Sequence, residues 1–317
     1  KMPVARNKKL ETRNSKLNTP SPPFRILYIV VFLFSFLLNA NTLKNDYVLD
    51  DDVVNRQNRY VQNGLGSVKD IFSHGFLYGF NQMNNQSYRP LTLLFFAAEH
   101  EWWGNNAKAN HFFQVLYYSV SNVLLLLLLL MLFRNYHYSI ALVIALLYAA
   151  HPIHTEVVAN ITSRTEILGL LFSLLSMIFL MKQVLSVDGK KISSFGRDVI
   201  HRTSIAFSGY RNILLSAFFY FCSLLSKENS ITLAFVIPFL LYFFTSFEWK
   251  KIAFLSLPFF GMMALYLLIR NAVLDTVVFG EKLDIINNAL MAAKTTSEMF
   301  ATNFVILGNY IKLLFFP

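Results

Sequence analysis

The sequence predicts an all-α polytopic membrane protein with about eight transmembrane helices and a large first external loop. Three observations support this fold class. Of the 317 residues, 55% are hydrophobic and only 15% are charged, against about a quarter in soluble domains. Apolar runs recur along the chain, and a membrane-spanning helix needs about 20 such residues. Basic residues gather at the ends of these runs, where they orient a membrane protein.

Composition also excludes other classes of protein. The 32 Phe and 15 Tyr residues are spread over repeated apolar runs, which rules out a disordered chain. The net charge of +10 would suit a nucleic-acid partner only with a basic face on a soluble fold, so no nucleic acid is expected. Cys222 is the single cysteine and lies in an apolar run, so no disulfide within the chain and no thiolate metal site are expected.

In chain order, the first element is the basic segment 1–23, which we expect in the cytoplasm. The apolar run Phe24–Leu43 follows, and no small-residue cleavage pattern comes after it, so we interpret it as a span and not as a signal peptide. The other expected spans are Phe112–Phe133, Ser139–Ala150, Ile167–Val184, Ile213–Leu225, Ile231–Phe247, Ile252–Ile269 and Phe300–Phe316. The runs 139–150 and 213–225 are short, so we expect these helices to continue into less apolar flanks.

The segment from about Asn41 to Asn110 is too long for a simple connection. It contains aromatic patches, including Trp102 and Trp103, so we expect a folded cap with one or two helices along the membrane interface. Its apolar stretch Leu91–Ala98 is a candidate re-entrant segment. The 271–298 loop is the second expected external element.

Lysine and arginine predict the orientation. With residues 1–25 in the cytoplasm and alternating spans, the cytoplasmic sections hold 16 basic and 4 acidic residues, and the opposite side holds 12 basic and 14 acidic residues. This is the positive-inside asymmetry. With this orientation of the spans, the conspicuous polar motifs lie on the non-cytoplasmic side. We therefore expect any reaction to take place on the periplasmic or luminal side.

The run Asp50-Asp51-Asp52 follows the first span. Adjacent carboxylates repel one another, so at least one of the three should have a raised pKa or a cationic partner. A carboxylate beside an apolar pocket can serve as general base toward a hydroxyl group. The alternative is a solvated acidic turn or a helix N-cap.

A second motif contains His151, His154 and Glu156, followed by Arg164 and Glu166. The two histidines and a glutamate could ligate a metal, but no third ligand is fixed, so the metal requirement stays open. They could equally bind a sugar or orient the aspartate run. A helix that begins at residue 155 would place Glu156 and Arg164 on one face. The alternative is a set of structural salt bridges at the membrane interface.

Two further cations lie at the outer ends of spans. Lys227-Glu228 interrupts a long apolar stretch, and Arg270 ends another span. A cation at this level can bind a lipid phosphate. The alternative is that each side chain reaches toward water from an apolar helix, Lys227 with Glu228 as its partner.

Four motifs in one order carry a family resemblance: Tyr-Val-Leu-Asp-Asp at 47–51, Tyr-Arg-Pro-Leu at 88–91, His-Pro-Ile-His-Thr-Glu at 151–156 with Ser-Arg-Thr-Glu-Ile-Leu at 163–168, and Leu-Leu-Ser-Lys-Glu at 224–228. The chain resembles the membrane domain of the transmembrane and tetratricopeptide-repeat (TMTC-type) O-mannosyltransferases and their bacterial relatives. The resemblance covers residues 24 to 317.

The resemblance implies a GT-C type glycosyltransferase fold. Such enzymes move a sugar from a polyprenyl- or dolichyl-phosphate carrier to an acceptor, usually with inversion; here the expected sugar is mannose and the acceptor an exported protein. The family's acidic pair matches Asp50 and Asp51, with the first acid favoured as catalytic base. Candidate ligands of the carrier phosphate are Lys227 and Arg270, then Arg89 or Arg164. Candidate sugar- or acceptor-binding residues are His151, His154, Glu156, Glu166 and Glu228.

Two departures from the family pattern matter. Asp52 turns the acidic pair into a triplet, so the position of the base is uncertain by one residue. No tetratricopeptide repeats are present, so we expect more spans and a repeat region beyond residue 317, and a possible larger membrane assembly. The open alternatives are transfer to a lipid or polysaccharide, a transporter, and a non-catalytic scaffold. The bacterial inner membrane is favoured over the endoplasmic reticulum.

Overall fold

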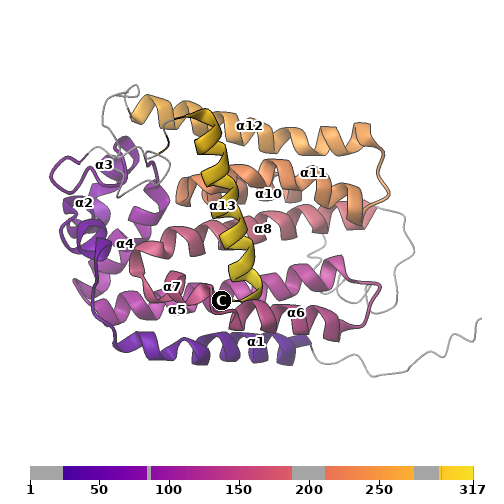
Figure 1. The fold of residues 1–317 in the computed structure, drawn as a ribbon, viewed down its shortest axis with the longest axis horizontal. Coiled ribbons are helices and arrows are strands. Elements are labelled where there is room, and N and C mark those ends of the chain that lie inside the picture. Colours follow the sequence, from indigo (N-terminus) through magenta and orange to yellow (C-terminus); the bar gives the residue numbers. More distant parts are fainter. Residues whose placement is uncertain (1–23, 84–86, 188–210, 275–292, 294, 317) are drawn as a thin grey trace, which may run out of the picture.

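A computed structural model describes residues 24–83, 87–187, 211–274, 293 and 295–316 (Figure 1). All elements in this part of the chain are helical, which confirms the predicted all-α class. The expected cytoplasmic segment 1–23, most of the expected cytoplasmic loop 182–211 between the fourth and fifth spans, and most of the 271–298 loop lie outside the described residues.

A helix is present at each predicted apolar run, and most of these helices lie along the same direction, side by side. Figure 1 shows consecutive long helices turning back on one another along the horizontal direction. They are α1 (Phe24–Leu38), α5 (Ala107–Leu132), α6 (Tyr138–Ala150), α8 (Arg164–Val187), α10 (Arg211–Ser226), α11 (Leu233–Phe244) and α12 (Trp249–Val273).

Three helical segments of the described chain are long and apolar enough to cross a membrane, namely Ala107–Leu132, Ile161–Leu185 and Trp249–Val273. The other apolar helices of the bundle are shorter, so the expected number of eight spans stays a prediction. The extension expected at α6 is wrong. The His137 side chain accepts a hydrogen bond from the Ser139 N–H at one end, and Pro152 follows directly beyond the other end, so the helix has 13 residues.

The predicted span at 300–316 forms a helix that differs from the others. This helix, α13 (Thr296–Phe315), has Thr295 as its N-cap, whose hydroxyl group accepts a hydrogen bond from the Glu298 N–H. Figure 1 shows α13 crossing the direction of the bundle helices, and none of its residues is buried.

The segment 41–110 is folded, as expected, although its position outside a membrane stays a prediction. It contains η1 (Ala40–Lys44), η2 (Asp52–Arg56), α2 (Arg59–Gln62), η3 (Gly64–Ser67), α3 (Val68–Ser73) and α4 (Pro90–Trp103). We call α2, η3, α3 and α4 the cap. Tyr60, Ile71 and Phe96 of the cap are buried in one apolar cluster, which Ile161 joins from the segment before α8. The candidate re-entrant stretch 91–98 is the first half of α4.

Small residues join α8 and α10 along an antiparallel seam. The Ser173 and Ser223 hydroxyl oxygens are 2.8 Å apart, and those of Ser176 and Ser216 are 3.2 Å apart. The Ser223 hydroxyl also donates to the Gly169 carbonyl at 2.7 Å. Small residues and hydroxyl groups are the usual means of close helix packing in a membrane, because the backbones can approach and the polar groups find partners.

Candidate functional site

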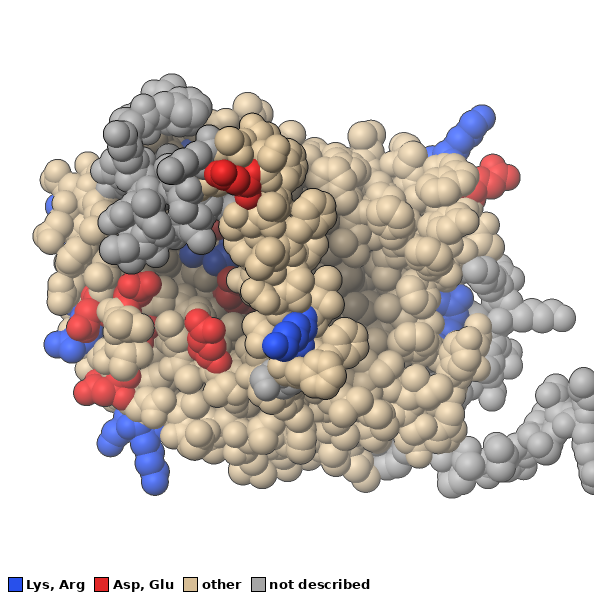
Figure 2. All heavy atoms as spheres, viewed as in Figure 1, with Lys and Arg blue, Asp and Glu red and all other residues tan. Residues whose placement is uncertain are grey.

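The predicted polar motifs meet at the end of the bundle that carries the cap, which we call the cap end. Here α1, α6, α10 and α12 end and α5, α8 and α11 begin (Figure 1). Figure 2 shows acidic side chains gathered on this end of the visible face, and charged side chains in the hollow beside α13. Alternation of antiparallel helices therefore brings together motifs that are far apart in the sequence.

The three adjacent aspartates have different environments, and Asp51 is the buried one. Its Oδ1 atom accepts hydrogen bonds from both the backbone N–H and the hydroxyl group of Thr162, each at 2.8 Å. Its Oδ2 atom accepts from the Val48 N–H at 3.1 Å. The Asp51 carboxylate therefore joins the segment after α1 to the segment just before α8.

Asp50 is exposed, and no hydrogen bond or ion pair reaches its carboxylate within the described part of the chain. The preceding Leu49 has a φ of +48° and an exposed fraction of 86%. A leucine in this left-handed region is strained, and such strain is common at functional sites. Asp52 forms a 3.2 Å ion pair with Arg56 one turn later. Of the three carboxylates, Asp50 is thus the one open to a ligand.

Arg164 is fully buried and bonded to protein groups on each side. It forms an ion pair with Glu99, donates from Nε to the Gln114 side chain at 2.9 Å, and donates from Nη2 to the Asn110 carbonyl at 2.6 Å. Its guanidinium lies 4.6 Å from the centre of the Phe96 ring. This placement assigns Arg164 to joining α4, α5 and α8, and it does not favour the role of phosphate ligand.

The partners of Arg164 were missed in the sequence. Glu99 lies in α4, and Asn110 donates to it at 2.7 Å. A signal was present in α5, where polar or hydroxyl-bearing residues recur every four positions on one face of an apolar helix. These residues are Asn110, Gln114, Tyr118 and Asn122. Tyr47 joins the same network through a 2.6 Å bond to Asn110, and burial raises the pKa of its hydroxyl group to about 12, so it remains a donor.

Two ion pairs lie at neighbouring positions of the segment between α10 and α11. The Lys227 ammonium is 2.9 Å from Glu166 at the start of α8, and the Arg89 guanidinium is 2.8 Å from Glu228. Lys227 and Arg89 retain exposed fractions of 15% and 18%. A Cβ atom added at Gly169 would lie 3.1 Å from the Lys227 Cβ, so the glycine permits this close approach. Both cations therefore reach the surface with a carboxylate beside them.

Arg270 belongs to the same region through α12. It lies one turn beyond Tyr266, whose hydroxyl group donates to the Tyr88 carbonyl at 3.1 Å. The Tyr88 N–H in turn donates to Glu228 at 3.1 Å. Arg270 is half-buried. The four predicted phosphate ligands thus fall into a buried one, Arg164, and three partly exposed ones.

The histidine motif does not form the continuous helix expected from residue 155. Helix α7 (His154–Ala159) ends at Asn160, where the backbone is extended, and α8 begins only at Arg164. The Glu156 side chain is exposed as a result. Within the described chain, no three His, Cys, Asp or Glu side chains are grouped closely enough to hold a metal ion.

The two histidines have different surroundings. His151 Nε2 lies 3.0 Å from the carbonyl oxygen of Leu314 in α13. The His154 ring packs against the rings of Tyr148 and Tyr118, at centroid distances of 4.4 and 5.8 Å. Burial, and then the neighbouring His151, lowers the pKa of His154. His154 is therefore a neutral, packed side chain, whereas His151 lies where α13 crosses the bundle.

Comparison with curated proteins supplies the decisive observation. Protein O-mannosyl-transferase TMTC4 of Mus musculus is 29% identical over 231 residues, which cover 67% of this chain and 28% of that protein. Protein O-mannosyl-transferase F38B6.6 of Caenorhabditis elegans is 29% identical over 175 residues, 54% of this chain and 25% of that protein. The chain resembles the TMTC-type protein O-mannosyl-transferases. The resemblance expected from the four motifs is thereby confirmed.

The resemblance has defined limits. A third relative, protein O-mannosyl-transferase tmtc2 of Xenopus laevis, is 36% identical over 91 residues, 29% of this chain and 9% of that protein. The chain thus spans about a quarter of the length of the first two relatives. No family model and no solved structure matches it. All three relatives come from animals, so they lend no support to the expected bacterial membrane.

Proposed function

We propose that this chain is the membrane-embedded part of a glycosyltransferase that moves a sugar, mannose by resemblance, to Ser or Thr hydroxyl groups of exported proteins. The observation that carries the proposal is the similarity to protein O-mannosyl-transferases over 67% of the chain. The cap end, on the periplasmic or luminal side, is the active face. A polyprenyl- or dolichyl-phosphate sugar is the donor, in keeping with the apolar helices on which the charged site is built.

Asp50 is the proposed catalytic base. It is exposed, so an acceptor hydroxyl group can reach it, whereas Asp51 accepts three hydrogen bonds from the protein. In the reaction, Asp50 accepts the hydroxyl proton as the acceptor oxygen forms a bond to C1 of the sugar. The bond from C1 to the carrier phosphate breaks, and the phosphate leaves with its electron pair. Asp51 is the proposed positioning residue, because its hydrogen bonds from Thr162 hold the chain next to Asp50 in place.

Lys227 and Arg270 are the proposed ligands of the departing phosphate, with Arg89 beside them. Developing charge on a leaving phosphate is stabilised by cations held in place before the reaction. Lys227 has Glu166 as its partner in the free protein, so phosphate binding exchanges a carboxylate for a phosphate oxygen. His151 and Glu156 are the proposed contacts to sugar or acceptor, because Glu156 is exposed and His151 is only partly buried.

The proposal is tested with membranes that contain the full-length protein, a labelled polyprenyl-phosphate mannose donor and an acceptor protein. We expect Asp50→Asn to abolish transfer, since general-base catalysis contributes about 100-fold to 10,000-fold. Asp52→Asn is the matched control and should retain most of the activity, because Asp52 pairs with Arg56. Equal transfer by Asp50→Asn and wild type would refute the assignment of the base, and no transfer by any folded full-length form would favour a scaffold.

A further inference from the structure

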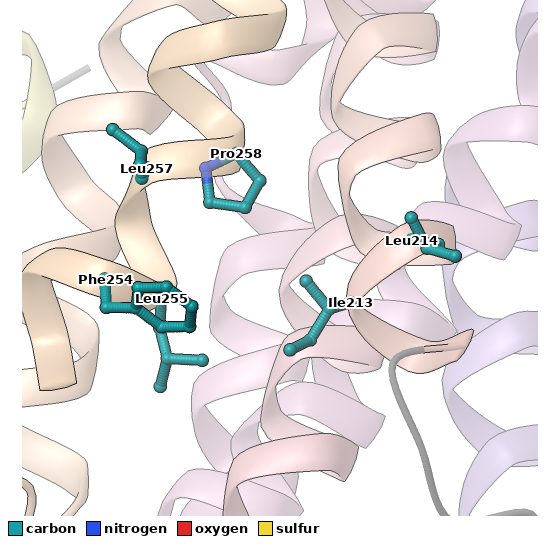
Figure 3. A pocket seen from close by; sticks show the side chains of 6 residues that line it. All are labelled: Ile213, Leu214, Phe254, Leu255, Leu257 and Pro258. Carbon is teal, nitrogen blue, oxygen red and sulfur yellow. The ribbon is translucent and has the colours of Figure 1, made fainter.

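An apolar cavity lies between α10 and α12, away from the charged residues of the cap end. Its volume is about 320 Å³, and its lining consists of Ile213, Leu214, Phe254, Leu255, Leu257 and Pro258. Figure 3 shows Ile213 on one helix and Pro258 on the other extending toward the space between them. This volume is within the range of about 300–1,000 Å³ typical of sites for small ligands.

The cavity opens to the outer surface of the bundle. Leu214, Phe254 and Leu257 have exposed fractions of 68%, 68% and 65%. On a helix that is apolar enough to span a membrane, such a surface faces lipid chains. A hydrocarbon chain can therefore enter the cavity from the side, without passing through water.

Two cations precede the cavity residues of α12. Lys250 and Lys251 each come four positions before a cavity residue of this helix. Residues four positions apart lie on the same face of a helix. Both lysines are exposed, and Glu248 is the acidic residue next to them in the sequence. This end of the cavity thus favours an anionic group.

An aromatic pair indicates the level of the membrane surface at this end. The rings of Trp249 and Tyr242 stack at a centroid distance of 4.9 Å, and both side chains are exposed. Tryptophan and tyrosine are enriched where the membrane meets water. The cavity residues of α12 lie five to nine positions beyond Trp249, about 7–14 Å deeper at 1.5 Å per residue. The cavity is then at the depth of the hydrocarbon chains.

We infer that this cavity binds one acyl chain of an anionic phospholipid, whose phosphate headgroup contacts Lys250 and Lys251. The cavity accounts for the chain, and the cations account for the headgroup. The distance along α12 between the cavity and the level of Trp249 matches the separation of chain and headgroup in a bilayer. A phospholipid with no net charge fits the cavity but offers Lys250 and Lys251 no net negative charge.

The test is retention of single lipids on the purified protein, measured by native mass spectrometry after exchange into detergent. The two probes are dioleoyl phosphatidylglycerol and dioleoyl phosphatidylcholine, which have the same chains. We expect one phosphatidylglycerol molecule to be retained in preference to phosphatidylcholine. The double substitution Lys250→Ser/Lys251→Ser should weaken retention about 25-fold, since each lysine near an anionic lipid contributes about fivefold. The control Lys44→Ser/Lys108→Ser should retain the lipid.

The cavity itself is tested by filling it. Leu257→Trp should abolish retention, whereas Leu268→Trp should not, because Leu268 is 68% exposed on the same helix but outside the cavity. Equal retention by these two variants would overturn the assignment of the cavity. Equal retention of the two lipids would overturn the role of the cations. Displacement of phosphatidylglycerol by an equimolar polyprenyl phosphate would identify the glycosyl carrier as the occupant and so refute the inference.

Discussion

Replacement of Arg164 by methionine tests the buried network at the cap end. The exposed fractions of the Arg164 and Glu99 side chains are 0% and 4%, so both charges are shielded from water. The substitution leaves Glu99 charged, with the Asn110 and Tyr117 side chains as its remaining donors among the described residues. Breaking a buried ion pair from one side costs about 3–5 kcal/mol, because the remaining charge is buried without compensation. We expect a loss of that size in the free energy of unfolding.

The assay is denaturant-induced unfolding in detergent micelles, followed by circular dichroism. Arg56→Met is the matched control, because its partner Asp52 is 39% exposed and such pairs contribute about 1 kcal/mol or less. The double variant Arg164→Met/Glu99→Gln should recover part of the loss, since it removes the unpaired charge. A loss below about 1 kcal/mol for Arg164→Met, no larger than for Arg56→Met, would refute the reasoning.

Three further predictions concern the same end of the bundle. Thr162→Val should lower transfer about tenfold by removing one of the donors to Asp51, whereas Thr162→Ser should retain transfer; equal activities would show that the hydroxyl group is dispensable. Gly169→Leu should destabilise the protein by about 1–3 kcal/mol, but Gly261→Leu, in open space on α12, should cost less in the same unfolding assay. The lowered pKa of His154 means that the unfolded chain binds more protons below about pH 6.5, so stability should fall as the pH decreases from 7 to 5. His154→Gln should reduce that fall in melting temperature, and an unchanged fall would contradict the burial argument.

The sequence predicts the helices well because apolar runs of sufficient length have few alternatives. Even so, their ends depend on local polar groups. The first run was expected to extend to Leu43, yet α1 ends at Leu38. Asn39 follows, and its side chain donates to the Ser35 carbonyl at 2.9 Å, after which the chain continues as η1. A hydropathy pattern does not predict such a hydrogen bond from a side chain to the backbone, so it does not predict where the helix ends.

The candidate site could be predicted in its location but not in its pairing. Antiparallel alternation is sufficient to bring Asp51, Lys227 and Arg270 to one end. Which partner each charge takes depends on how helices pack, and Arg164 illustrates this. Its sequence neighbours suggested Glu156 and Glu166. The turn at Asn160 separates Arg164 from Glu156, Glu166 pairs with Lys227, and Glu99 from another helix is the actual partner of Arg164.

The serine seam between α8 and α10 fixes the longitudinal register of the two helices. Sliding one helix by a turn, about 5.4 Å, would break both serine pairs and the bond from Ser223 to the Gly169 carbonyl. Glu166 lies in the first turn of α8, and Lys227 follows the end of α10. A slip of the two helices would therefore also separate these two charges. The serine pairs therefore set the height of α8 relative to α10, and any change in that height would reach the cap end as the loss of an ion pair.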